Sequence, residues 1–300
     1  MATPTLRRIL PRKLCLHRQS RPMSSSVDWT DIDLNGSPPP GAVVEHLIPA
    51  FIVARLCAVA NHGRHWEPRP FRMDGQKTPA GPATRTPPMS DISFWTEHWN
   101  NPAGLPAGLP PVTSSSPDLR RPADRVFEAL GSTTNPYAMI MMQDRLQTAK
   151  ARLESYTEPI SAHSARALLR QATAPDGSGG DDPTNDLIAP LQEASAVFEL
   201  TRDPEIARQI QAIRGLVTAQ LMVVEQHCPG AQGFTAHWDE FYPYYFSAVS
   251  GFARRWARGH IGEMRTAYEA SPGAYARDAV LEELVEREKK VEEMRYAFEG

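Results

Sequence analysis

Apolar residues recur every three or four positions through most of the second half of the chain. This spacing places side chains on one face of an α-helix and is typical of helices that pack on a core. The clearest series are Ala138, Met142, Leu146, Ala149, Leu153 and Tyr156, then Ile206, Ile210, Ile213, Val217, Leu221 and Val224, and finally Val280, Leu284, Val291, Met294 and Phe298. Residues 117–300 are therefore predicted to form an all-α domain.

Helix boundaries in this domain indicate about six helices. Asn135-Pro136 and Asp203-Pro204 each combine an N-cap residue with proline at the first helical position, where its missing N–H is tolerated. Other helices are expected at about 160–172, 187–200, 235–270 and 273–298. No alternating β-branched run appears after residue 117, and the connections are short, so we expect an antiparallel helical bundle.

Proline sets the preceding residues apart, since 20 of the 28 prolines come before residue 138. Proline fixes φ and lacks a backbone donor, so residues 28–116 are expected to form a proline-rich, largely irregular arm. Two short helical islands are predicted within this arm. The first, residues 42–60, would be one buried helix.

The second island, residues 90–99, is predicted to be a short amphipathic helix with Ile92, Trp95 and Trp99 on one face. Its tryptophans indicate that it packs against an apolar surface. That surface is either the C-terminal domain or a partner protein.

Charge sets the first 27 residues apart. They contain six basic residues and no acidic one, so the remaining residues carry −9 within a chain whose net charge is −3. An arginine-rich, serine-rich, acid-free segment with apolar residues near helical spacing is typical of a mitochondrial transit peptide. We expect import into the mitochondrial matrix; a start at Met23 would instead leave a cytoplasmic form. The chain thus divides into a leader (1–27), an arm (28–116) and a helical domain (117–300).

The densest unusual feature is residues 234–256, which hold nine of the chain's 24 aromatic residues. One helix face cannot bury nine rings, so some could line a pocket in which arginines hold an acid group. The candidate ligand-binding residues are Trp238, Tyr242, Tyr245, Arg254, Arg255 and Arg258, and the candidate acid–base residues are His237, Asp239 and Glu240. The alternative is an aromatic core helix whose arginines pair with surface carboxylates.

Other chemistries receive less support from the sequence. His62 and His65 have metal-binding side chains, but no third ligand can be named, so we expect surface or structural histidines, no metal site and no cofactor. Cys228, at a helix end before Pro-Gly, is expected to be a small buried residue. The longest apolar run, residues 47–60, is too short to span a bilayer, and the charge of −9 argues against a nucleic-acid partner.

Two functions are therefore carried forward. In the first, the protein is a soluble mitochondrial interaction or assembly module, and the aromatic helix supplies the surface for a protein partner. In the second, it is an enzyme or carrier that binds a small apolar or anionic molecule in an aromatic-lined helical pocket.

Overall fold

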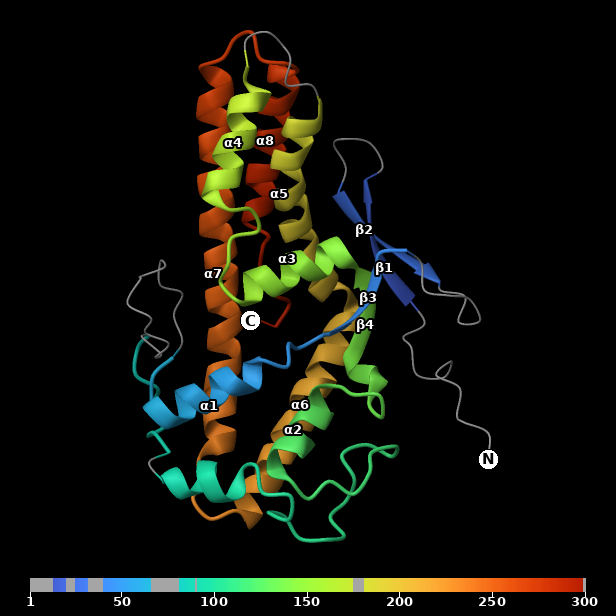
Figure 1. The fold of residues 1–300 in the computed structure, drawn as a ribbon, viewed down its shortest axis with the longest axis vertical. Helices are drawn as coiled ribbons and strands as arrows, with labels where there is room; N and C mark the ends of the chain where they lie inside the picture. Colours follow the sequence, from blue (N-terminus) through green and yellow to red (C-terminus); the bar gives the residue numbers. More distant parts are fainter. Residues whose placement is uncertain are drawn as a thin grey trace. The chain divides into compact units, whose positions relative to one another are not determined.

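Helices hold most of the residues that the structure describes, and the fold is all-α, as the sequence predicts (Figure 1). The structure is a computed structural model that describes residues 13–19, 25–31, 40–65, 81–89, 91–174 and 181–298. The chain divides into two compact units. The first comprises Met1–Leu14, Asp31–Met141 and Pro204–Ala248, and the second comprises Cys15–Thr30, Met142–Asp203 and Val249–Gly300.

The first unit contains helices α1 (Ile52–His62), α2 (Pro122–Leu130), α6 (Pro204–His227) and the beginning of α7 (Phe234–Glu269). Helices α2 and α6 pack against each other (Figure 1). Strand β3 (Ala42–His46), the π-helix η2 (Phe94–His98) and the 3₁₀-helix η3 (Pro136–Ala138) complete this unit. Long irregular segments join these elements, in agreement with the proline content of this part of the sequence.

The second unit is a helical bundle around α5 (Asp181–Arg202). Helix α5 packs against α3 (Asp144–Glu154), α4 (Ala162–Ala172) and α8 (Arg277–Val291). Figure 1 shows α4, α5 and α8 running beside the later part of α7. The helices predicted at 187–200 and 235–270 are therefore present, with bounds that differ by a few residues at most of their ends.

Strands form in segments that the sequence analysis assigned to helix, to the leader or to the irregular arm. β1 (Lys13–Gln19), β2 (Ser25–Asp31), β3 and β4 (Met139–Gln143) are hydrogen-bonded in the order β2-β1-β4-β3. The helix predicted from Ala138 to Tyr156 is wrong in its first part, because β4 occupies that part and α3 begins only at Asp144. Residues 140–142 are all buried, and a short, fully buried apolar run fits a strand as well as a helix.

The single helix predicted for residues 42–60 is also wrong. Residues 42–46 form β3, in which Val43 and Val44 favour extended backbone. Helix α1 starts only after Pro49, and Gly63 ends it in the left-handed conformation (φ 61°), with its N–H bonded to the Val59 carbonyl at 2.8 Å.

Residues 91–99 of the second island dock inside the first unit, and residue 90 lies outside the described residues. The Trp99 N–H donates to the Phe94 carbonyl at 2.8 Å, which is the five-residue spacing of a π-turn. This spacing buries Phe94 and leaves Ile92 73% exposed, so the predicted helical face is wrong at Ile92. The rings of the segment contact Phe234 at centroid distances of 5.5–5.8 Å. Docking onto a helix of the C-terminal region is therefore confirmed.

The three-part division into leader, arm and helical domain stays a prediction. Residues 1–12 and 20–24 of the expected transit peptide lie outside the described residues, as do residues 32–39 and 66–80 of the arm.

Candidate functional site

The aromatic residues predicted to bind a ligand lie in the core of the first unit. Trp238, Tyr242 and Tyr245 each have no exposed surface. The Trp238 and Tyr242 ring centroids are 5.0 Å apart, and the Tyr245 ring continues the cluster through Phe246 at 5.0 Å. Such tilted and edge-on contacts are the arrangement that aromatic rings prefer in a packed core. The rings therefore stabilise the unit, and a ligand role for them stays a prediction.

The arginines of the same prediction belong to the second unit. Arg254 donates to the Met294 carbonyl at 3.3 Å, Arg258 forms an ion pair with Glu292, and Arg255 is exposed. The Arg258 hydrogen bond is the main cause of a Glu292 pKa below its usual range. Arg254 and Arg258 of α7 thus bind residues 292–294, which follow α8.

The candidate acid–base residues are divided between surface and interior. Asp239 is exposed and lies 3.9 Å from Arg214, whereas Glu240 accepts hydrogen bonds from residues 81–89. The Arg85 N–H donates to the Glu240 carboxylate at 2.7 Å, and the Thr86 N–H donates to it at 3.1 Å. We call this joint between residues 81–89 and α7 the clasp.

Two histidines complete the clasp. His237 is fully buried, and its Nε2 lies 2.9 Å from the Pro87 carbonyl, to which it donates as Nε2–H. His65 Nε2 lies 3.2 Å from the Glu240 carboxylate, and its ring stacks on Tyr244 at 3.9 Å. His65 is thus structural, as expected.

The electrostatics of the clasp follow from burial and hydrogen bonding. Burial lowers the pKa of His237 below its usual value, despite the Pro87 carbonyl and nearby carboxylates. Burial alone would raise the pKa of Glu240, but its hydrogen bonds outweigh that effect and lower the pKa. At neutral pH the clasp therefore combines a neutral imidazole with a charged carboxylate.

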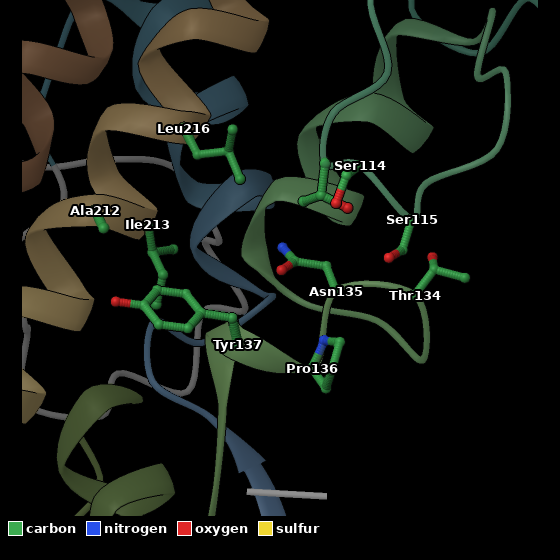
Figure 2. Close-up of a pocket in the computed structure, with 10 residues that line it drawn as sticks. Ser114, Ser115, Thr134, Asn135, Pro136, Tyr137, Ala212, Ile213 and Leu216 are labelled. Carbon is green, nitrogen blue, oxygen red and sulfur yellow. The ribbon is translucent and has the colours of Figure 1, made fainter. Parts of the chain in front are cut away.

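A pocket of about 370 Å³ opens elsewhere on the first unit, between two turns and α6 (Figure 2). Figure 2 shows apolar side chains of α6 on one side and small polar side chains on the other. Tyr137 stands beside Ile213 and is 58% exposed. The full lining is Thr113, Ser114, Ser115, Thr134, Asn135, Pro136, Tyr137, Ala212, Ile213 and Leu216.

One buried carboxylate braces the polar side of this pocket. Glu128, on α2, accepts hydrogen bonds from the Ser116 hydroxyl at 2.6 Å and the Thr134 hydroxyl at 2.7 Å. Its backbone carbonyl also accepts from the Asn135 amide at 2.8 Å. Glu128 therefore ties the turn at 113–116 to the turn at 132–135, which fixes the pocket before anything binds.

The pocket offers uncharged polar groups and apolar surface. The hydroxyls of Ser114, Ser115 and Tyr137 have no hydrogen-bond partner within the described part of the chain. A volume of this size fits one large side chain or a small molecule. These groups can hydrogen-bond to and pack against a bound side chain or small molecule.

The sequence analysis missed this pocket, although a signal was present. Two runs rich in Ser and Thr, TSSS at 113–116 and STTN at 132–135, flank α2. Such residues form turns through side-chain hydrogen bonds to nearby backbone, so each run by itself indicates only a turn and not a pocket. Only the fold shows that Glu128 joins them.

The rest of the described chain adds no metal centre and no membrane span. Within it, no group of three or more His, Cys, Asp or Glu residues could hold a metal ion. Cys228 is buried, and burial raises the pKa of its thiol, as expected for a structural residue. None of the helices among the described residues combines the length and apolar character needed to cross a bilayer. Neither a known protein family, nor a curated protein, nor a solved structure matches the chain.

Proposed function

We propose that this protein is an interaction module that binds a partner protein through the pocket and the adjoining face of α6. The pocket would receive an apolar side chain of the partner. The hydroxyls at its rim would bond the partner's backbone, and Tyr137 would pack against the inserted segment. Tyrosine is among the residues enriched at protein interfaces, and exposed Tyr137 has the position of an anchor.

The observation that carries the proposal is an exposed, uncharged stripe on α6. Ala212, Gly215, Ala219 and Met222 are all exposed, and their spacing of three, four and three residues places them on one helix face. Ala212 also lines the pocket, so the stripe and the pocket form one surface. A helix face that is exposed to water normally carries charge, whereas interface centres are depleted in charged residues.

Gly215 strengthens this argument. Glycine inside a helix costs about 1 kcal/mol relative to alanine. A Cβ at Gly215 would meet nothing within 4 Å in the described structure, so the packing of the unit does not require glycine there. Close approach of a partner is a reason for glycine at this position.

Charge-introducing variants test the proposal. The tagged full-length protein would be compared with Ala219→Glu and Tyr137→Ala in affinity capture followed by mass spectrometry. Ala54→Glu is the matched control, because Ala54 is exposed on α1. We expect one set of proteins to be captured by wild type and control and lost by the two test variants. Equal capture by all four would refute the α6 surface as the binding site. Circular dichroism at neutral pH would confirm that each variant is folded.

We also propose that the protein acts in the mitochondrial matrix, which the charge and serine content of residues 1–27 support. A fluorescent reporter fused after residue 27 should reach mitochondria. Replacing Arg7 and Arg8 with Glu should abolish import, and a fusion beginning at Met23 should stay cytoplasmic. Diffuse fluorescence from the first fusion would contradict the proposal.

A further inference from the structure

We propose that the clasp between residues 81–89 and α7 is a pH-sensitive latch, closed when His237 is neutral and opened when it gains a proton. The proposal is independent of the partner-binding function, because it concerns different residues. It starts from the buried position of His237 and the single hydrogen bond that its ring makes.

The closed latch suits only the neutral imidazole. His237 donates through Nε2 to the Pro87 carbonyl at 2.9 Å, so its Nδ1 is the unprotonated nitrogen. Nδ1 is buried and has no hydrogen-bond partner among the residues described. Protonation would place an N–H and a positive charge there without an acceptor. Burying such a group is costly, and opening the latch relieves the cost by admitting water.

The charged groups around His237 do not remove this cost. Glu240 on α7 and Glu225 on α6 favour its protonated form, and His65, after α1, opposes it. Glu225 accepts from both the backbone N–H and the hydroxyl of Thr235 at 2.9 Å, and the Glu240 carboxylate is occupied by residues 85–86. Burial outweighs both carboxylates, and the pKa of His237 stays below 6.5.

The sign of the pH effect follows from linkage. His237 has a lower pKa in the closed state than in the open state, so the open state binds more protons. The equilibrium constant for closing is therefore largest well above pH 6.5 and falls as pH decreases through that value, by less than tenfold per pH unit for one proton. Glu240 acts in the same direction at lower pH, because its pKa is also lowered. A protonated His65 would instead strengthen its contact with Glu240.

Opening would release a defined segment. The Thr84 N–H donates to the Gly63 carbonyl at 2.9 Å and the Met89 N–H donates to the Ala60 carbonyl at 2.7 Å, so these two bonds hold the segment on its other side. They lie at the C-terminal end of α1. Loss of the Glu240 and His237 contacts would leave residues 85–87 without their anchor on α7.

Amide hydrogen exchange by NMR measures the latch directly. The reporters are the Arg85 and Thr86 amides, which are bonded to Glu240, and the control is the Cys228 amide, which is bonded to the Val224 carbonyl. After correction for intrinsic exchange, we expect the protection of both reporters to fall from pH 6.5 to 5.5, by no more than about fivefold when His237 alone titrates with its ordinary pKa in the open state. The Cys228 amide should stay unchanged. Constant reporter protection, or a parallel loss at Cys228, would overturn the proposal.

The variant His237→Gln separates His237 from the other titrating groups. Its side-chain amide can donate to the Pro87 carbonyl and does not titrate, so reporter protection should no longer fall as pH decreases over this range. A decline equal to that of wild type would assign the effect to another group and overturn the proposal. If the variant does not fold, titration of the His237 ring protons in the wild type decides. Their pKa should lie below 6.5 and coincide with the loss of reporter protection, and titration without that loss would overturn the proposal.

Discussion

The two units are stabilised by different cores. In the first, fully buried rings gather along the start of α7, and Trp238, Phe241 and Tyr245 are completely inaccessible to solvent. In the second, the interior also holds ion pairs: Lys150 with Glu154 at 2.9 Å, and Arg287 with Glu283. All four of these charged side chains are nearly or fully buried.

The difference between the cores predicts different responses to substitution. Rings stabilise in proportion to the apolar area that they bury, so the loss on truncation depends on the size of the cavity left. A buried ion pair contributes little net stability, because desolvation offsets its attraction. Removing one partner of such a pair is nevertheless costly, since the other charge stays buried.

The largest effect is expected in the aromatic core. Trp238→Ala should reduce the free energy of unfolding by about 3–5 kcal/mol, because a fully buried indole is replaced by a cavity. Urea denaturation followed by circular dichroism measures the change. Trp238→Phe is the matched control and should cost much less, since the indole Nε1 has no hydrogen-bond partner in the described structure. Equal losses for the two variants would show that shape, not buried area, dominates this core.

The ion pairs of the second unit should show the opposite pattern. Glu154→Ala should cost about 3 kcal/mol, because the buried Lys150 would lose its ion pair with Glu154. The double variant Lys150→Met/Glu154→Leu should be close to wild type or more stable. Urea denaturation of the two variants tests this. A double variant less stable than the single one would mean that the ion pair contributes real net stability.

These cores also explain how much the sequence could predict. Helical spacing identified Ile206 to Val224 and Val280 to Val291 correctly, because each helix buries one face and exposes the other. It extended the last helix too far, since α8 ends at Val291 and the helix was predicted to continue to residue 298. It failed at residues 139–143, where both faces are buried and periodicity carries no information. The sequence analysis predicted that some rings of residues 234–256 could line a pocket, because one helix face cannot bury nine rings. In the fold, Phe94 and Trp99 of the arm pack against Phe234, so the arm helps to cover this ring.

The first unit also contains a buried carboxylate, Glu128, whose side-chain partners in the described structure are hydroxyl groups and not a cation. Glu128→Ala should cost about 1–3 kcal/mol, because the Ser116 and Thr134 hydroxyls lose their acceptor. Glu128→Gln keeps one acceptor oxygen and should cost less. Thermal unfolding measures both, and the Ser115 and Tyr137 NMR signals should shift in the alanine variant if the pocket loses its shape. Unchanged signals would contradict the bracing role of Glu128.

The second unit also has a half-buried carboxylate, Glu193, for which burial should make stability depend on pH. Burial raises its pKa to about 7, although Arg145 acts in the opposite direction. The folded state therefore binds a proton that the unfolded state releases above pH 4.5, so stability falls as pH rises through 7. Glu193→Gln should stabilise the protein at pH 8 by about 1 kcal/mol, after allowance for solvent screening, and by much less at pH 5. Equal effects of the substitution at both pH values, measured by urea denaturation, would contradict this titration.

The smallest effect is expected at the edge of the second unit, where Arg258 meets Glu292. Both side chains are at least half exposed, so water and salt screen their attraction. Arg258→Ala should leave the urea midpoint unchanged, yet the pKa of Glu292 should rise toward its usual value, because the Arg258 hydrogen bond is the largest cause of its depression. NMR titration of the Glu292 carboxyl measures that change, and Arg258→Lys should restore part of it. A clear loss of stability in the alanine variant would place this ion pair with the buried pairs at Lys150 and Arg287. Burial would then not determine how much stability is lost when an ion pair of this unit is broken.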